Sequence, residues 1–219
     1  EEPRFLNRMH SLSSMEYKVR TLLVCIKLLC VSLFLLNAMS SLAFSEPNIK
    51  KPNVSGQFYS AQPKKLSADI DAFFSQASVQ PSEKHVEILI APHAGYMYSG
   101  GVAAHGFKAV SQQGYRTVVI LAPSHYMYLD GISIWEEGGF ETPLGIVEVD
   151  KAFTKKLIAA NEKFYFEPQA FEQEHSLEVE IPFLQKTLSG FKIVPVIMGQ
   201  PSLRLLEEFA AALKETIGD

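Results

Sequence analysis

Short runs of apolar residues alternate with amphipathic stretches from residue 66 to residue 217. Apolar or alternating runs of strand length predict strands at 86–91, 117–122, 131–135, 146–149 and 191–198. Apolar residues at helical spacing predict helices at 66–74, from Ser99 to near Gly114, and at 151–160, 176–188 and 203–217. Because strands and helices alternate, we expect an α/β fold, a three-layer sandwich whose mostly parallel or mixed central sheet is flanked by helices.

Two of the predicted strands end in nearly the same phrase. Residues 88–93 read Ile-Leu-Ile-Ala-Pro-His, and residues 120–125 read Ile-Leu-Ala-Pro-Ser-His. With the helix between them, these strands are expected to form a right-handed βαβ unit. Ligands of open α/β sheets bind outside the carboxyl ends of the strands, and imidazole is the commonest metal ligand and a frequent acid or base. His93 and His125 are therefore predicted to share a metal centre or a catalytic dyad.

A third histidine, His175, stands at the start of a predicted helix. The partial positive charge of a helix N-terminus disfavours protonation of an imidazole, so His175 could serve as a neutral base or ligand, with a capping or surface histidine as the alternative. The neighbouring Glu174 and Glu178 are expected to be solvated or to help cap the helix. Two histidines with an anionic third ligand suit iron(II), other first-row metals or zinc, and spacing does not choose among them.

The first 45 residues are predicted to be a separate N-terminal extension with a signal peptide or membrane anchor. Basic residues, the last of them Lys27, precede the apolar run 28–36, and residues 41–43 (Ser-Leu-Ala) have the small-x-small pattern of a cleavage site. The apolar stretch 21–44 is also long enough to span a bilayer, which keeps an anchor as the alternative. A cleaved leader predicts an exported protein, periplasmic or secreted, whereas a retained one predicts membrane association through residues 21–44.

Composition and absent motifs exclude several classes of function. The formal net charge is −4 and no basic stripe is present, so nucleic acid is not an expected partner. The sequence contains no Gly-x-Gly-x-x-Gly fingerprint, no Walker loop and no Gly-x-Ser-x-Gly elbow. Dinucleotide, nucleoside triphosphate and serine-hydrolase chemistry are therefore not indicated.

Several longer motifs together carry a family resemblance. They are Ser-Gly-Gln-Phe-Tyr at 55–59, Ala-Pro-His-Ala-Gly-Tyr-Met-Tyr-Ser-Gly at 91–100, Ala-Pro-Ser-His-Tyr at 122–126, Thr-Pro-Leu-Gly at 142–145, Glu-His-Ser-Leu-Glu-Val-Glu-Ile-Pro-Phe at 174–183 and Val-Pro-Val-Ile-Met-Gly at 194–199. In this order and spacing they resemble the Memo-like family, also labelled AmmeMemoRadiSam system protein B. The family is similar in fold to class III extradiol ring-cleaving dioxygenases, which use a non-haem iron. Residues 46–219 are accordingly expected to form one Memo-like α/β domain.

The resemblance also implies roles for the three histidines. His93 and His125 match two metal ligands of the family, and His175 matches the histidine placed like the catalytic base of the dioxygenases. The metal is expected to be iron or copper, with zinc as an alternative. The family's third ligand is a cysteine near the C-terminus. This chain ends at Asp219, before that region, so we expect a domain truncated at its C-terminus that lacks the third ligand.

Different functions remain open at this point. The first is a metal-dependent, dioxygenase-like oxidoreductase acting on an unidentified small molecule. The alternative is a non-enzymatic protein that binds a peptide or another partner in the same cleft, lined by Tyr96, Tyr98 and Tyr126. A weaker third hypothesis is hydrolysis by a zinc-bound water.

Overall fold

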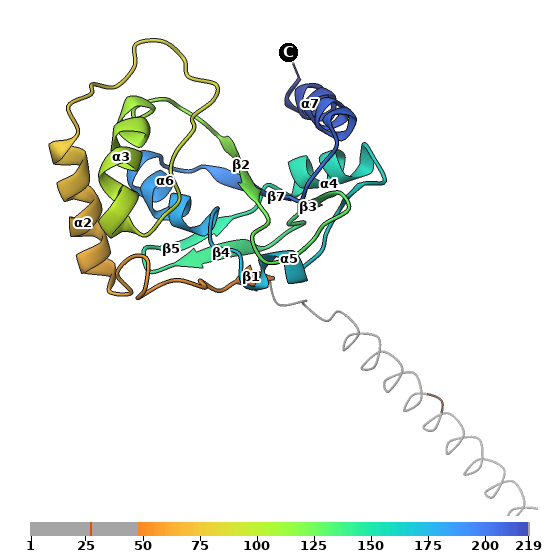
Figure 1. Cartoon of the computed structure of the whole chain (residues 1–219), viewed down its shortest axis with the longest axis horizontal. Helices are drawn as coiled ribbons and strands as arrows, with labels where there is room; N and C mark the ends of the chain where they lie inside the picture. Colours follow the sequence, from red (N-terminus) through yellow and green to blue (C-terminus); the bar gives the residue numbers. More distant parts are fainter. Residues whose placement is uncertain (1–26, 28–47, 219) are drawn as a thin grey trace, which may run out of the picture. The chain divides into compact units, whose positions relative to one another are not determined.

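Helices and strands alternate along the part of the chain that this computed structural model describes, which is residue 27 and residues 48–218. The helices are α2 (Pro63–Gln76), α3 (Tyr96–Ala109), α4 (Lys151–Ala159), α5 (Gln169–Glu172), α6 (Ile181–Thr187) and α7 (Leu203–Ile217), with a 3₁₀ turn at Glu178–Glu180. The strands are β1 (Ile49–Lys50), β2 (Thr117–Pro123), β3 (Ile132–Ile134), β4 (Gly139–Thr142), β5 (Gly145–Glu148), β6 (Phe164–Tyr165) and β7 (Lys192–Met198). The predicted α/β class is confirmed (Figure 1).

The strands form two mixed sheets. The larger sheet has the order β2-β7-β3-β6, in which β7 runs parallel to β2 and antiparallel to β3. The smaller sheet has the order β1-β4-β5, in which β4 runs parallel to β1 and antiparallel to β5. Strand β2 is an edge strand, and its carboxyl end at Pro123 leads directly to His125.

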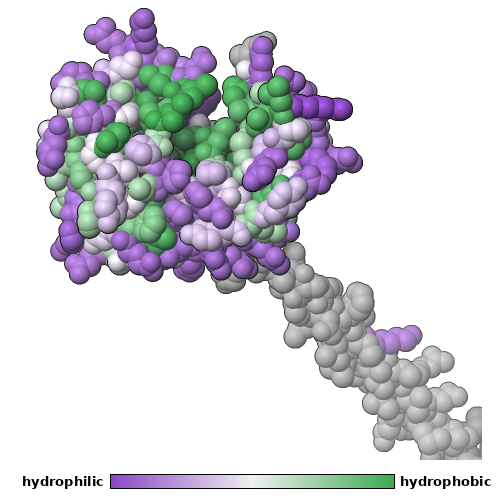
Figure 2. Space-filling model, in the orientation of Figure 1, coloured by the Kyte–Doolittle hydropathy of each residue, from purple (hydrophilic) through white to green (hydrophobic). Residues whose placement is uncertain are grey.

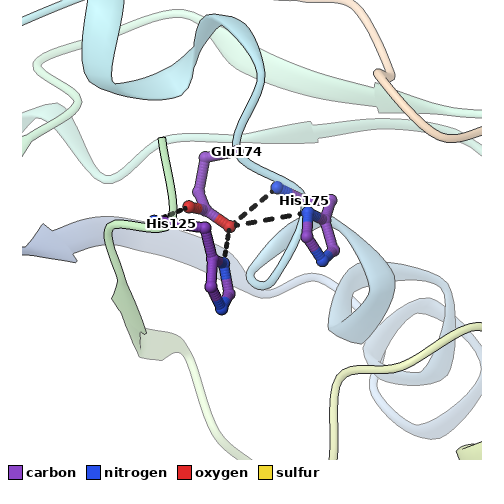
Figure 3. A group of neighbouring side chains, drawn as sticks. All are labelled: His125, Glu174 and His175. Carbon is purple, nitrogen blue, oxygen red and sulfur yellow. Dashed lines mark hydrogen bonds and ion pairs between the residues drawn. The ribbon is translucent and has the colours of Figure 1, made fainter. Parts of the chain in front are cut away.

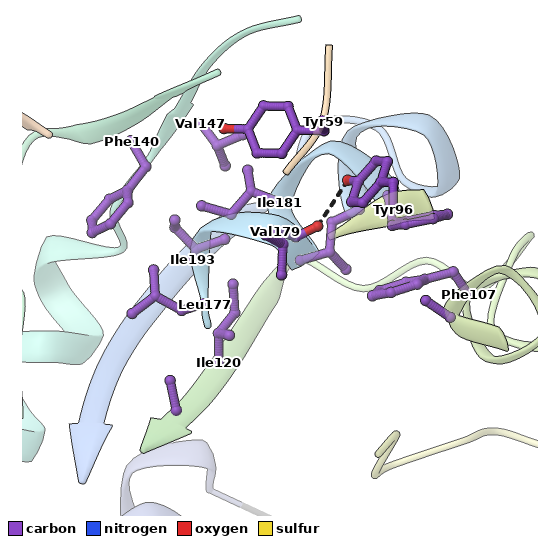
Figure 4. Packing of buried hydrophobic residues seen from close by; sticks show 14 of the residues in the cluster. Tyr59, Tyr96, Phe107, Ile120, Phe140, Val147, Leu177, Val179, Ile181 and Ile193 are labelled. Carbon is purple, nitrogen blue, oxygen red and sulfur yellow. Dashed lines mark hydrogen bonds between the residues drawn. The ribbon is translucent and has the colours of Figure 1, made fainter. Parts of the chain in front are cut away.

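Strand β7 organises the core because its side chains alternate between two apolar layers. Ile193 and Ile197 pack in the layer that includes residues of α2, α3 and α6, part of which is shown in Figure 4. Val194 and Val196 face the opposite way and pack with residues of α4 and α7. All four side chains are fully buried. A strand covered by helices on both faces is expected to be apolar throughout, which explains the apolar run at 193–198.

The segment 86–91 is the main departure from the predicted fold, because it is not a strand. Within the described residues it pairs with no strand, and Ile88 and Ile90 are 82% and 93% exposed. Tyr115 anchors its start by donating a hydrogen bond to the carbonyl of Val86. Figure 2 shows apolar side chains gathered on this face of the molecule around a hollow. The prediction of a buried strand and a βαβ unit was therefore wrong. An apolar run predicts burial, but a strand also needs a neighbouring strand to pair with its backbone N–H and C=O groups.

This exposure gives a direct stability test. Replacing Ile90 by serine is expected to change the free energy of unfolding by less than about 0.5 kcal/mol, because the side chain buries almost nothing. The same change at Ile120, which is 8% exposed in β2, should cost about 2–5 kcal/mol. Urea denaturation of Ile90→Ser and Ile120→Ser beside the wild type measures both. Similar costs at the two positions would show that residues 86–91 pack as a strand in solution.

Three helices begin at other residues than predicted, and the first is α2, which starts at Pro63 instead of residue 66. Helix α3 starts at Tyr96, directly after Gly95, and Ser99 is inside it rather than at its cap. The predicted kinked helix 176–188 is instead a 3₁₀ turn followed by α6, with Pro182 in the first turn of α6. Proline is tolerated there because N–H groups in the first turn of a helix have no carbonyl partner within the helix, so its missing N–H costs no helical hydrogen bond.

The predicted leader at residues 1–45 lies outside the described residues, apart from Lys27, and it stays a prediction. Within the described part of the chain, no helix combines the length and the apolar character that crossing a membrane requires.

Candidate metal centre

Three histidines from separate segments lie together beyond the carboxyl end of β2. His125 follows β2, His175 follows α5, and His93 precedes α3 in a loop rather than at a strand end. The ring centroids of His93 and His125 are 5.4 Å apart, those of His125 and His175 are 5.1 Å apart, and those of His93 and His175 are 6.3 Å apart. The structure therefore brings all three predicted site residues into one cluster.

Two of the three separations, 5.4 Å and 5.1 Å, fit imidazoles around one metal ion, whereas the 6.3 Å between His93 and His175 is wider. With metal–nitrogen distances of about 2 Å, three histidine rings around one tetrahedral ion have centroids roughly 5 Å apart. The rings of His125 and His175 are also nearly parallel, with an interplanar angle of 13°. One ligand atom from each of His125, Glu174 and His175 lies within 4.8 Å of the others, so this group could hold a metal ion.

Glu174 connects the site histidines. Its carboxylate accepts hydrogen bonds from Nδ1 and the backbone N–H of His125 and from the backbone N–H of His175 (Figure 3). It also accepts hydrogen bonds from the backbone N–H and hydroxyl of Ser176. Burial alone would raise the pKa of this carboxyl, but these bonds from His125 and Ser176 lower it to about 2. Solvation, one of the two roles predicted for Glu174, is wrong, because its side chain is only 1% exposed.

The entry segment before α2 supports the site from behind. The Asn53 side-chain amide donates to the backbone carbonyl of Glu174 (2.8 Å), and the ring of Phe58 lies edge-on against His175 with centroids 4.9 Å apart. Glu178 fixes this segment by accepting hydrogen bonds from the backbone N–H of Asn53 (2.6 Å) and from the hydroxyl of Tyr59 (2.6 Å). Glu178 is buried too, so its predicted solvation is also wrong.

The sequence contained only a weak signal for these supporting residues. A glutamate directly before His175 is typical of a solvated or helix-capping residue, so the sequence did not point to a buried carboxylate that binds the histidines. Asn53 and Phe58 lie more than a hundred residues before His175 in the chain, and no local pattern relates such distant positions. Their roles follow only from the tertiary contacts.

The charge state around the cluster favours neutral imidazole at His93. Burial lowers the pKa of His93, and the neighbouring rings of His125 and His175 lower it further, against a smaller opposing effect of Glu174. A neutral ring presents the free lone pair that metal binding requires. Tyr126 places its hydroxyl 3.5 Å from Nδ1 of His175, so a second proton-carrying group adjoins that ring.

The predicted aromatic lining of the cleft is wrong for Tyr96. Tyr96 is a core residue, 6% exposed, and its hydroxyl donates to the Val179 carbonyl (2.8 Å; Figure 4). Tyr98 and Tyr126 are 81% and 60% exposed and are accessible from solvent. Tyr96 is therefore excluded as a contact for a ligand in the cleft.

Comparison with known proteins places these residues in a family. The profile of the Memo-like protein family matches residues 50–219. A MEMO1 family protein of Caldivirga maquilingensis is 36% identical over 176 residues, which cover 77% of this chain and 62% of the relative. A MEMO1 family protein of Sulfolobus acidocaldarius is 37% identical over 181 residues, which cover 77% of this chain and 64% of that relative. The chain thus spans less than two thirds of the length of these relatives.

Proposed function

This chain belongs to the Memo-like family, and on that premise we propose that it provides a non-haem metal site for dioxygenase-like oxidation. His93 and His125 are the proposed ligands, and His175 is the proposed acid or base beside them. The observation that carries the proposal is the convergence of three imidazole rings from three separate segments, with centroids 5.1–6.3 Å apart.

The donor set favours a first-row transition metal. Neutral imidazole suits iron, copper and zinc, and the site offers no thiolate among the described residues. We propose iron or copper, because oxidation of a substrate by oxygen requires a redox-active metal. When bound, such a metal would activate oxygen and polarise the substrate.

The protein residues have distinct roles in this proposal. His93 stays neutral because burial and its imidazole neighbours lower its pKa, so its nitrogen is free to bind the metal. His175 holds or releases the proton of the bound substrate, and the adjacent Tyr126 hydroxyl can exchange it with solvent. Glu174 and the entry segment hold the rings in place.

Metal stoichiometry tests the proposal. The purified chain, loaded anaerobically with Fe(II) or separately with Cu(II) and then desalted, is expected to retain about one equivalent by elemental analysis, as a single three-histidine cluster implies. His93→Ala and His125→Ala should each lose most of it, because each removes one of the two proposed nitrogen ligands. His85→Ala is the matched control, since His85 is exposed and packs beside Tyr115 outside the cluster. Stoichiometric metal that survives both His93→Ala and His125→Ala would contradict the site.

A second function, binding of a peptide or protein partner, is favoured by one observation. Apolar and aromatic side chains near the cluster are strongly exposed: Met97, Tyr98, Tyr126 and Tyr128 are 81%, 81%, 60% and 76% exposed. Such side chains suit an aromatic or apolar ligand. Oxygen consumption with a panel of catechols would support the dioxygenase-like function. Capture of a partner that persists after chelation, with no oxygen consumption, would support the binding function.

A further inference from the structure

The Glu174 carboxylate is saturated by five hydrogen-bond contacts, most of them from backbone N–H groups. Three of the donors are backbone N–H groups, those of His125 (2.7 Å), His175 (2.9 Å) and Ser176 (2.9 Å). The Ser176 hydroxyl adds a fourth bond at 2.8 Å, and Nδ1 of His125 a fifth at 2.9 Å. Four of the five meet on Oε1 alone, which exceeds what one carboxylate oxygen normally accepts.

This saturation separates Glu174 from the metal ligands. A metal held at about 2 Å by Oε1 would have to displace several of these hydrogen bonds, including the two that satisfy the buried N–H and hydroxyl groups of Ser176. The side chain is only 1% exposed, so water could not replace the lost partners. Proximity to two imidazoles therefore does not make Glu174 a ligand.

The same bonds determine how His125 presents its ring. The backbone donors require an acceptor at Glu174, so the hydrogen of the contact with Nδ1 must be on the imidazole. Nε2 of His125 is then left without a hydrogen and free to bind. Glu174 also accepts a hydrogen bond from the backbone N–H of His175. A single side chain therefore sets the relative position of His125 and His175, whose ring centroids are 5.1 Å apart.

We propose that Glu174 is a positioning residue that fixes His125 in the Nδ1–H tautomer and aligns it with His175, so that Nε2 of His125 faces the metal. This inference rests on the metal site proposed above, although the tautomer itself does not require a metal. A carboxylate behind a ligating histidine typically contributes 10–100-fold to metal affinity.

The first test needs no metal and no variant of Glu174. The nitrogen-15 shifts of the uniformly labelled, metal-free chain report which ring nitrogen of each histidine is protonated, and the spectrum of His125→Ala identifies the signals of His125. We expect Nδ1 of His125 to carry the hydrogen. A hydrogen on Nε2 of His125 in the wild type would overturn the proposal, whatever the outcome of the metal experiments.

The second test compares two carboxylates. Glu174→Gln is expected to weaken Co(II) binding by about 10–100-fold and to alter the visible spectrum of the bound cobalt, because the ring of His125 is released. Glu180→Gln removes a half-buried carboxylate that makes no hydrogen bond to a histidine of the cluster, and it should change cobalt affinity by less than about threefold. Glu174→Asp, which keeps the charge, should recover part of the affinity.

The outcomes distinguish this inference from the proposed function. Failure of the wild type to bind cobalt would contradict the metal site but leave the tautomer measurement to decide the role of Glu174. Wild-type binding that depends on His125, with the same affinity and spectrum in Glu174→Gln, would overturn the positioning role alone. Circular dichroism verifies that each variant is folded before its affinity is interpreted.

Discussion

Replacement of Phe183 by alanine is expected to lower the free energy of unfolding by about 3–5 kcal/mol. The side chain is 1% exposed and lies among aromatic rings, with centroids 4.9 Å from Tyr96 and 5.1 Å from Phe107. The Phe107 contact is a stack with an interplanar angle of 5°. Truncation would leave a cavity that these rings cannot fill, because both belong to helix α3 and are buried in the close-packed core.

The effect is measured by urea denaturation monitored by circular dichroism. Phe183→Leu should cost clearly less than Phe183→Ala, because more of the volume is kept. Tyr128→Ala is the control for loss of an aromatic ring at the surface, since Tyr128 is 76% exposed, and it should cost less than about 0.5 kcal/mol. Equal destabilisation by Phe183→Ala and Tyr128→Ala would contradict the described core.

Replacement of Glu180 by glutamine is expected to stabilise the chain at alkaline pH. Burial raises the pKa of the Glu180 carboxyl from its ordinary value of 4.5 to about 8. The unfolded chain releases this proton near pH 4.5, whereas the folded chain keeps it until about pH 8. Wild-type stability is therefore complete below pH 4.5 and is lost as the pH rises through 8. Glutamine does not titrate, so the variant avoids this loss.

The gain has a defined dependence on pH. A shift of this size corresponds to at most roughly 5 kcal/mol, so Glu180→Gln should exceed the wild type by roughly 2–5 kcal/mol at pH 9 and by almost nothing at pH 4. Urea denaturation of both proteins at several pH values measures the difference in their free energies of unfolding. The contributions of all other titrating groups cancel in that difference. The exposed Glu215→Gln serves as the control and should show no such trend. A difference that is constant from pH 4 to pH 9 would show that Glu180 is solvated.

Much of the fold was predictable because local pattern and final burial agree. Helix α7 has the predicted bounds 203–217, and β7 begins one residue after the predicted start at 191. In both cases the apolar residues that set the pattern are the ones that pack in the core. Segment 86–91 shows the limit: its apolar residues predicted burial, but β2 pairs only with β7 among the described strands, and Ile88 and Ile90 stay exposed.

The residues of the candidate site were likewise predictable only in part. Sequence alone singled out His93, His125 and His175, because each stands at an end of a predicted element where side chains can converge. It predicted that Glu174 and Glu178 are solvated or help cap a helix, since a glutamate beside a helix start is ordinarily exposed or capping. Their burial depends on the entry segment around Asn53, which reaches them across the fold.

The sequence by itself determined the α/β class, the family and the three histidines, because periodicity and contiguous motifs are local properties of the chain. The tertiary structure alone decided which carboxylates are buried, which ring nitrogen of His125 faces Glu174, and that residues 86–91 are not a strand. Each of these depends on hydrogen bonds between residues distant in sequence, such as the contact of Glu174 with His125. Such contacts exist only when the whole fold brings the partners together.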